Sequence, residues 1–420
     1  MRALTTEQIA SMSTAQVASL REAQLAAIRT EQLVAMTTQQ VAALGTSQIV
    51  ALTTEQAVAL TSDQVVALST RQIAAIETRD LVNLTTANIE ALGSAQVAAL
   101  STQQIAALGT DQFVAIETTD IRALGTAQVV AMTTGQIAAM TTNQLTAMST
   151  AQIASLTTTQ VGTLDTTQVS ALTTTQLASL TTAQITALSG TQLASITTDT
   201  ITALTSAQIR AIETGDVNLL ETAQIEAMTS GQIGAFTSAQ IAALSTDQIV
   251  AIESNDLPAL ASAQITALAS DQLQALISDQ LTALTTAQIA WLTTAQVPQL
   301  LDAQISQLTT RQAAALTSAQ VAVLTDGQVA ALTTDQFSAL LTRQLTAFTT
   351  TQLGSVTTDQ VAALNSTQLS AFTTAQVAAL SSDQLIAIET EDLPGMTTSQ
   401  LRAIATDNLA ALLTGQISAL

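Results

Sequence analysis

The 420-residue sequence contains no Cys, His or Tyr and only one Trp. Catalytic triads built on His, thiol nucleophiles and histidine metal sites are therefore absent. Gly-rich phosphate-binding loops are missing as well. Although 47% of the residues are apolar, no apolar run approaches the roughly 18 residues that a membrane span needs. We therefore expect no enzymatic activity, no bound cofactor and no membrane insertion.

Positive charge is also scarce. Ten Lys and Arg residues face 31 Asp and Glu residues, which gives a net charge of −21. A chain this acidic is a poor partner for nucleic acid or for an anionic membrane. Many of the carboxylates recur at one sequence position, represented by Glu7, where we expect the first turn of a helix. Helix dipoles favour acids there by about 0.3–1 kcal/mol each.

The sequence has a strict period of eight residues. A large apolar side chain stands at every eighth position from Leu4 through Met12 to Leu420, without insertion or deletion, which makes 52 units that we call octads. The consensus is L-T-T-x-Q-[IVL]-x-A, as in residues 4–11. An array this uniform is typical of a solenoid. We predict one continuous octapeptide-repeat solenoid over residues 1–420.

Each position of the octad follows its own rule. The Ile9 position holds only Ile, Val, Leu, Phe or Ala, so together with the Leu4 position it supplies two large buried groups per octad. The Ala10 position accepts charged residues and all three prolines, Pro258, Pro298 and Pro394. Only a solvent-facing position tolerates such variety, and we predict that it forms the outer face.

Three folds compete for this pattern. In one long helix, eight residues advance about 2.2 turns, so the apolar stripe would drift around the helix. A β-solenoid suits the Thr, Ile and Val content, but its corners need Gly, Asn or Asp, and Gly occurs only 14 times. We favour an all-α solenoid, or superhelix, of very short helices with one helix per octad. The β-solenoid remains the alternative.

Helix-capping residues support this choice. The Thr6 position is Thr or Ser in 48 of the 52 octads, and hydroxyl side chains commonly begin helices. If Thr5 is the N-cap instead, Gln8 becomes the third helical residue and completes a capping box. In either case the helix fills about the second half of each octad. Isolated helices below about 12 residues are marginal in water, so the octads must be stabilised by stacking on one another.

The Gln8 position is Gln in 44 octads and never Glu. A row of like charges would repel, whereas an amide both donates and accepts hydrogen bonds. One hypothesis is therefore a buried run of Gln side chains that stack on one another along the axis. The other is that each Gln only caps its own helix at the surface.

Five octads replace Thr by Glu and Gln by Asp together. Paired carboxylates supply the hard oxygen ligands that Ca²⁺ prefers, and the alternative is a variant helix cap. Successive members of this set are five, twelve, five and seventeen octads apart, which indicates a higher-order repeat of seventeen octads. The candidate Ca²⁺ ligands are Glu77, Asp80, Glu117, Asp120, Glu213, Asp216, Glu253, Asp256, Glu389 and Asp392.

Over its whole length the chain resembles the octad-repeat regions of large, Thr-rich, acidic, cysteine-free surface or secreted proteins of Gram-negative bacteria. This resemblance implies an extracellular or cell-surface location and a structural role as a filament, an adhesin stalk or biofilm matrix. Both ends of the sequence, residues 1–3 and 416–420, keep the octad pattern without a polar capping repeat. Either the sequence is a segment of a longer array or each chain stacks on the next, and in the second case we expect head-to-tail self-association into a fibre. The alternative is a solenoid binding scaffold for a peptide, a glycan or Ca²⁺.

Overall fold

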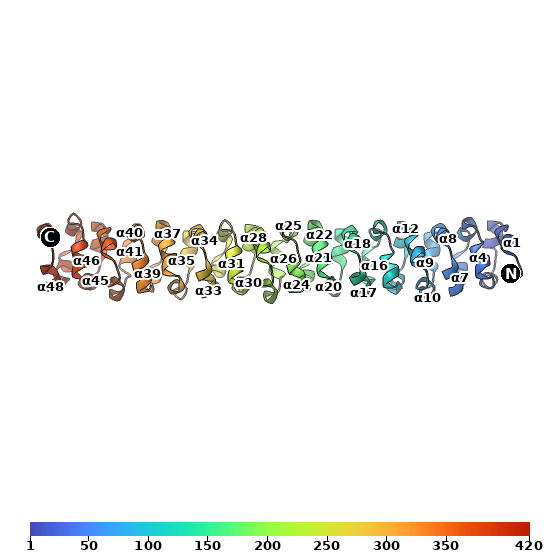
Figure 1. Ribbon diagram of the computed structural model, residues 1–420, viewed down its shortest axis with the longest axis horizontal. Helices are drawn as coiled ribbons and strands as arrows, with labels where there is room; N and C mark the ends of the chain where they lie inside the picture. Colours follow the sequence, from blue (N-terminus) through green and yellow to red (C-terminus); the bar gives the residue numbers. More distant parts are fainter. The chain divides into compact units, whose positions relative to one another are not determined.

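The computed structural model describes residues 1–420 and is entirely helical. It contains 49 α-helices and three 3-10 helices, one for each octad, and no strand (Figure 1). This confirms the prediction of an all-α solenoid with one short helix per octad, and the β-solenoid alternative is not supported. None of the helices is both long and apolar enough to span a lipid bilayer.

The chain forms two compact units, Met1–Ile212 and Glu213–Leu420, and each is described on its own. Octads follow one another without interruption through each unit. The prediction that one array spans residues 1–420 stays a prediction.

The first unit contains α1 to α26, drawn from blue to green in Figure 1. Their bounds are α1 Thr6–Ala10, α2 Thr14–Ala18, α3 Glu22–Ala26, α4 Thr30–Val34, α5 Thr38–Ala42, α6 Thr46–Val50, α7 Thr54–Ala59, α8 Ser62–Ala67, α9 Thr70–Ala75, α10 Thr78–Leu81, α11 Thr86–Glu90, α12 Ser94–Ala99, α13 Thr102–Ala107, α14 Thr110–Val114, α15 Thr118–Ile121, α16 Thr126–Ala131, α17 Thr134–Ala139, α18 Thr142–Ala147, α19 Thr150–Ser155, α20 Thr158–Gly162, α21 Thr166–Ala171, α22 Thr174–Ser179, α23 Thr182–Thr186, α24 Gly190–Ala194, α25 Thr198–Ile201 and α26 Ser206–Ala211.

The second unit contains α27 to α49 and the 3-10 helices η1 to η3. Their bounds are α27 Thr214–Val217, α28 Thr222–Ala227, α29 Ser230–Ile233, α30 Ser238–Ala243, α31 Thr246–Ala251, η1 Leu257–Ala259, α32 Ser262–Ile265, α33 Ser270–Ala275, α34 Ser278–Ala283, α35 Thr286–Trp291, η2 Val297–Gln299, α36 Asp302–Gln307, α37 Thr310–Ala315, α38 Ser318–Val321, α39 Asp326–Ala331, α40 Thr334–Ser338, α41 Thr342–Leu345, α42 Thr350–Leu353, α43 Thr358–Ala362, α44 Ser366–Ala371, α45 Thr374–Ala378, α46 Ser382–Ala387, η3 Leu393–Gly395, α47 Thr398–Ala403, α48 Thr406–Ala410 and α49 Thr414–Ala419.

Most of the helices begin with a capping box. In α17, the Thr133 hydroxyl accepts a hydrogen bond from the Gln136 backbone N–H at 3.2 Å. In return, Gln136 Oε1 accepts the Thr133 backbone N–H at 2.8 Å. The second residue of the consensus Thr pair is therefore the first helical residue, and the first is the N-cap. This settles the two capping alternatives in favour of the Thr5 position.

Within each unit the chain winds as a coil whose successive turns stack. A helix packs against the helix three octads further along, as α13 packs against α16 and α36 against α39. Side chains also bond to backbone groups 28 and 31 residues earlier. The shorter of these spacings is three and a half octads, so each octad lies between two octads of the neighbouring turn.

The core of each unit follows three positions of the octad. The Ile9 and Leu4 positions are buried in nearly every octad, as in Ile137 and Met140, which are 0% and 4% exposed. The third buried position is the Gln8 position. The Ala10 position lies outside, where Val66 and Val130 are about half exposed. This confirms both the two buried apolar groups and the outer face predicted from the sequence.

Proline explains the three 3-10 helices. Pro258, Pro298 and Pro394 each lie in one of them. A proline in this place cannot donate the backbone hydrogen bond that closes an α-helical turn, and its ring clashes with the carbonyl four residues earlier. The octad therefore tightens to a 3-10 turn, while Leu257, Val297 and Leu393 remain buried.

Candidate functional site

The repeating chemical site of this protein is the Gln side chain that joins one turn of the coil to the next. Gln136 lies in α17 and is 1% exposed. Its Nε2 donates to the Ile105 and Leu108 carbonyls of α13 and its link, both at 2.8 Å. Gln328 of the second unit repeats this arrangement with the Val297 and Leu300 carbonyls, at 2.8 and 2.7 Å.

These acceptors are the backbone groups that a short helix leaves unsatisfied. The last carbonyls of an α-helix have no intrahelical donor. Gln40, for example, donates to the Ile9, Ala10 and Met12 carbonyls, where α1 ends, at 3.0, 3.1 and 2.7 Å. One amide thus caps the N-terminus of its own helix through Oε1 and the C-terminus of the helix four octads earlier through Nε2.

The two sequence hypotheses for the Gln8 position were each half correct. The Gln side chains are buried and hydrogen-bonded, and they also cap their own helices. The predicted stacking of Gln on Gln is wrong, because the partners of these amides are backbone groups of the preceding turn. Glu is absent at this position since a carboxylate has no N–H to donate and would repel the carbonyl oxygens.

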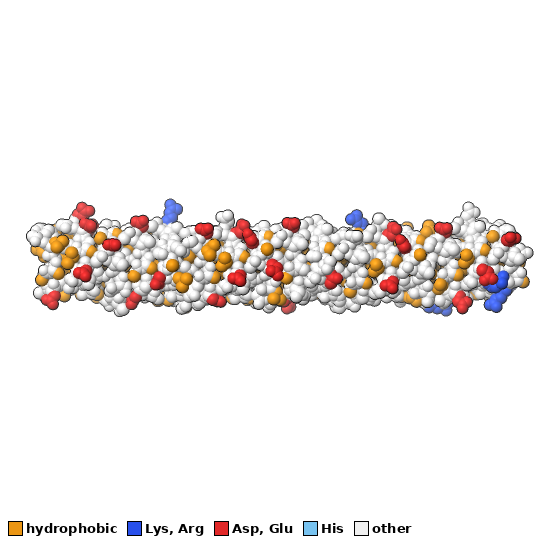
Figure 2. Space-filling model, viewed as in Figure 1, with side chains coloured by type: hydrophobic (Ala, Val, Ile, Leu, Met, Phe, Trp, Pro, Cys, Tyr) orange, Lys and Arg blue, Asp and Glu red, His pale blue; other side chains and the backbone are white.

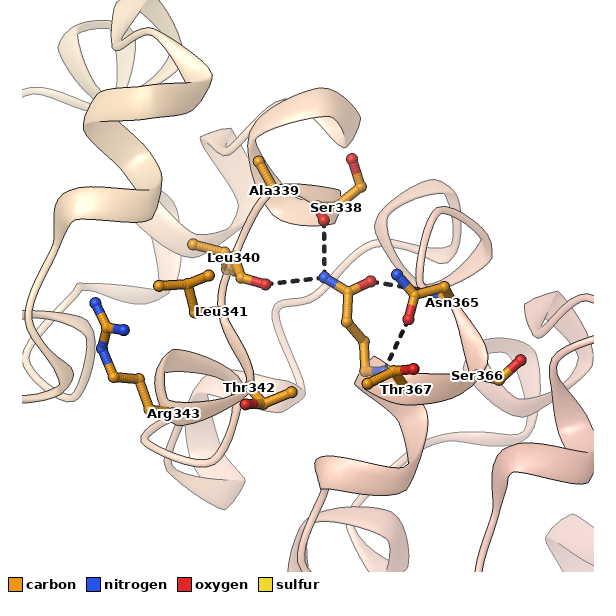
Figure 3. Close-up of a pocket in the computed structure, with 10 residues that line it drawn as sticks. Ser338, Ala339, Leu340, Leu341, Thr342, Arg343, Asn365, Ser366 and Thr367 are labelled. Atoms are coloured by element: carbon orange, nitrogen blue, oxygen red, sulfur yellow. Dashed lines mark hydrogen bonds between the residues drawn. The ribbon is translucent and has the colours of Figure 1, made fainter.

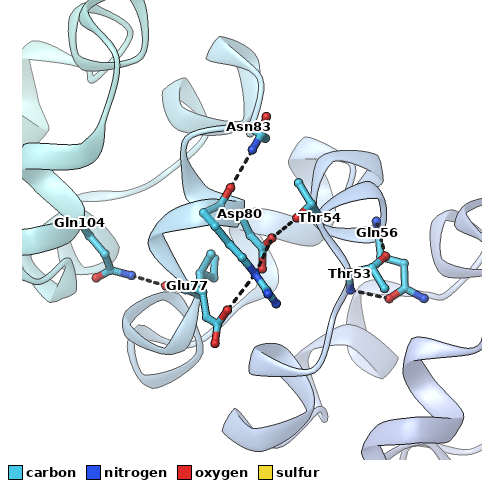
Figure 4. A network of polar contacts seen from close by, with 9 residues as sticks. Thr53, Thr54, Gln56, Glu77, Asp80, Asn83 and Gln104 are labelled. Carbon is cyan, nitrogen blue, oxygen red and sulfur yellow. Dashed lines mark hydrogen bonds and ion pairs between the residues drawn. The ribbon is translucent and has the colours of Figure 1, made fainter.

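The octads with Glu and Asp make a different contact. Asp80 is 2% exposed, and its Oδ1 accepts a hydrogen bond from the Thr54 hydroxyl at 2.6 Å (Figure 4). Thr54 is the first residue of α7, three octads earlier. Arg79 Nε lies 2.9 Å from Glu77 Oε2 and 3.5 Å from Asp80 Oδ1. A hydrogen bond still joins the two turns of the coil, but donor and acceptor are exchanged, because the side chain of the later octad now accepts.

The same exchange recurs in other acidic octads. Asp120 accepts from the Ser94 hydroxyl, and Asp256 from the Ser230 hydroxyl. Asp392 accepts from both the hydroxyl and the backbone N–H of Ser366, at 2.7 and 2.8 Å. Each hydroxyl belongs to the first residue of a helix, where the helix dipole favours a negative charge.

The remaining candidate residues lie nearer to solvent. Asp216 is half-buried, as is Glu77, whereas Glu117, Glu213, Glu253 and Glu389 are exposed. Nothing in the structure explains why Glu accompanies Asp in these octads. Nowhere do three Asp, Glu, His or Cys side chains come close enough together to hold a metal ion. The structure therefore brings Asp80, Asp120, Asp256 and Asp392 each to a hydroxyl of the neighbouring turn, a contact that sequence reasoning missed. Asp216 differs, because the residue at the corresponding place is Gly190, which has no hydroxyl.

Surface grooves recur at one register of the coil. One is lined by residues 338–343 and 365–368 (Figure 3), and another by residues 74–79 and by Ser101, Gln103 and Gln104. In both, the N-cap position of the earlier octad, which is usually Thr, holds a larger residue that lines the groove, Leu341 or Glu77. The floor is the ordinary Gln contact, since Gln368 donates to the Ser338 and Leu340 carbonyls at 2.7 and 2.9 Å. These grooves therefore lie on the surface where octads of two neighbouring turns meet.

The fold and these contacts define a class of protein. It is an α-solenoid of octads in which Gln side chains of one turn of the coil bond to backbone carbonyls of the preceding turn. A family model, the ALTTAQ repeat, matches the chain at residues 22–54, 33–70, 73–110, 113–150, 142–174, 209–246, 249–286, 329–366 and 385–420. These matches cover more than half of the sequence, and the chain belongs to the ALTTAQ repeat family. None of the curated proteins matches it.

The donor role of the buried Gln predicts a large effect of Gln136→Glu. Glu keeps the capping box with Thr133 but sets an unpaired carboxylate against two carbonyl oxygens. We expect the free energy of unfolding to fall by about 3–5 kcal/mol, measured by urea denaturation. Gln103→Glu, at an exposed position of α13, is the matched control and should change it little. Equal effects of the two variants would contradict the role of the Nε2 bonds.

The reversed contact predicts that Ser230→Ala destabilises the second unit. Asp256 is 7% exposed, and losing its hydroxyl donor should lower the free energy of unfolding by about 1.5 kcal/mol. Ser278→Ala is the control, because Ser278 is exposed at the same position of an octad and has Gln304 where Ser230 has Asp256. If both variants are equally stable, the Ser–Asp bond contributes nothing.

Titration calorimetry tests whether the candidate residues of the acidic octads bind Ca²⁺. A Ca²⁺ site at these octads would release or absorb heat on titration with CaCl₂ and raise the melting temperature, because ligands that bind only the folded state stabilise it. With Asp80, Asp120 and Asp256 already bonded to hydroxyl groups, we expect neither change at millimolar Ca²⁺. Heat that disappears in the Asp120→Asn variant would show that the site exists.

Proposed function

We propose that this chain is a structural repeat protein that forms a fibre or stalk by end-to-end stacking of solenoids. The observation that carries the proposal is the contact between turns. Every turn of the coil directs Gln amide donors to the preceding turn and backbone carbonyl acceptors to the following turn. The repeat itself therefore sets no limit on the number of turns that can stack. A head-to-tail contact of this kind propagates into a filament.

The surface suits a structural role outside the cell. Acidic side chains are scattered along the visible face of each unit, and Arg side chains are few (Figure 2). A net charge of −21 keeps such molecules soluble and opposes binding to nucleic acid. Location at the surface of a Gram-negative bacterium or in its secreted matrix agrees with the resemblance of the octad consensus and with the lack of cysteine. We propose no catalytic role.

The binding-scaffold alternative requires its variant octads to gather on one face. Glu77 and Glu117 are five octads apart, whereas one turn of the coil takes about three and a half octads. They therefore lie on nearly opposite sides of the first unit. A single surface for a peptide, a glycan or Ca²⁺ is not built by these octads, and fibre formation is the better-supported function.

Self-association tests the proposal. We expect the mass of the 420-residue protein, measured by light scattering between micromolar and millimolar concentration, to rise steadily with concentration, since open-ended stacking has no preferred size. Electron microscopy should then show unbranched filaments one solenoid wide. A protein that stays monomeric over this range, or that stops at a dimer, would contradict a fibre.

A further inference from the structure

Neighbouring turns of the coil are joined by side chains alone. Between residues 39 and 151 of the first unit, every hydrogen bond between backbone groups joins residues three or four apart along the chain, so none of them crosses to another turn. The bonds that do cross are made by side chains, such as Gln136 Nε2 on the Ile105 and Leu108 carbonyls. Two turns can therefore separate while the backbone hydrogen bonds of their helices stay intact.

The acidic octads make fewer contacts than the octads around them. α10 and α15, the helices of Asp80 and Asp120, have four residues each and no capping box. A carboxylate has no N–H to donate. The Leu52 and Leu92 carbonyls lie 28 residues before these Asp residues, at the register of the Gln bonds, and so receive no amide N–H from them. Both Leu residues are buried.

A single hydroxyl bond stands in place of the missing contacts. The Thr54 hydroxyl donates to Asp80 Oδ1 at 2.6 Å. In the octad before, Gln72 donates to the Val41 and Leu44 carbonyls at 3.1 and 2.8 Å and also completes a capping box. Because a buried carbonyl without a donor costs free energy, the contact between turns at an acidic octad is weaker than the contact at a Gln octad.

We propose that the first unit is an extensible element, in which axial tension separates turns one at a time and begins at the acidic octads. Tension along the axis crosses the contacts between turns in series, so the weakest contact opens first. Opening one turn releases about 28 residues, or roughly 90–100 Å of extended chain. Such turns lengthen the proposed stalk under load, although the property itself does not require copies to associate.

Separated turns re-form readily on relaxation. The bonds between turns join residues 25 to 31 positions apart, as in Arg122 Nε on the Ala147 carbonyl and Gln136 on Ile105. Contacts between residues close in sequence form fast, because little chain has to be ordered before they are made. We therefore expect one molecule to be stretched and relaxed repeatedly with the same steps.

Force spectroscopy on the full chain tests the proposal. The chain has no Cys, so Gln39→Cys and Ala151→Cys supply the only two attachment points. Both positions are exposed and lie fourteen octads, or four turns, apart within the first unit. We expect two steps of about 28 residues at low force, from the turns of Asp80 and Asp120, before the remaining turns open at higher force. A single cooperative opening of the whole segment would overturn the proposal.

Restoring an ordinary octad tests the role of the acidic residues. With Glu77→Thr and Asp80→Gln added, position 80 can again complete a capping box and donate to the carbonyls of the preceding turn. We expect one of the two low-force steps to disappear and the step at Asp120 to remain. The matched control, Glu55→Thr with Asp63→Gln, removes the same charge at exposed first-turn positions of the same turn and should keep both steps.

The variants separate this proposal from fibre formation. If both low-force steps survive in the restored variant, or if the control also loses one, the acidic octads do not decide where turns separate and the proposal is wrong. Light scattering on the unchanged chain measures independently whether copies associate. A chain that stays monomeric yet opens turn by turn would overturn the fibre alone.

Discussion

The structure depends on an amide that bonds in two directions. A buried Gln accepts the N-cap N–H of its own helix and donates to the carbonyls at the end of a helix one turn earlier, as Gln136 does for Thr133, Ile105 and Leu108. A helix of five or six residues leaves most of its backbone groups unsatisfied at its ends, so the fold is possible only if other groups bond to both ends. The length of the side chain matters as well. Asn88, shorter by one methylene, makes a looser 3.2 Å bond to the Thr85 N–H and reaches the Leu60 carbonyl at 3.0 Å.

Because each contact joins neighbouring turns, stability in each unit is a sum over stacked turns. The hydrogen bonds between turns join octads that are three or four apart, in contrast to a globular core that gathers distant segments. Solenoids of this kind behave as nearly one-dimensional arrays, in which each repeat is stabilised by its neighbours. The acidic octads fit this scheme, since Asp80 gives up the donor role of Gln and takes a hydroxyl from α7 in its place. One turn can therefore change its chemistry without altering its neighbours.

The sequence predicted the octad well and the coil poorly. The capping pair, the two apolar positions and the outer face each follow from a rule that acts within a single octad, and Thr133, Met140 and Val130 lie where those rules place them. The length of a coil turn could not be predicted, because the consensus repeats every octad and nothing in it recurs every three and a half octads. The Ser94–Asp120 contact could not be predicted for a related reason. Ser or Thr occupies the position of Ser94 in 48 of 52 octads, so a hydroxyl at that position does not distinguish the octads that face an Asp from those that do not.

Each turn of the coil has a donor face, on which Gln Nε2 groups point to the preceding turn, and an acceptor face, on which helix-end carbonyls point to the following turn. This difference restricts how such a solenoid can associate along its axis. Two donor faces brought together would place amide N–H groups against one another, and two acceptor faces would oppose carbonyl oxygens, with buried polar groups unsatisfied in both cases. A dimer closed by a twofold axis is therefore unfavourable at either end. Only a donor face on an acceptor face reproduces the bonds found inside each unit, and that contact leaves one face of each kind exposed again. The same amide that stabilises the fold thus gives any axial association a direction and no natural end.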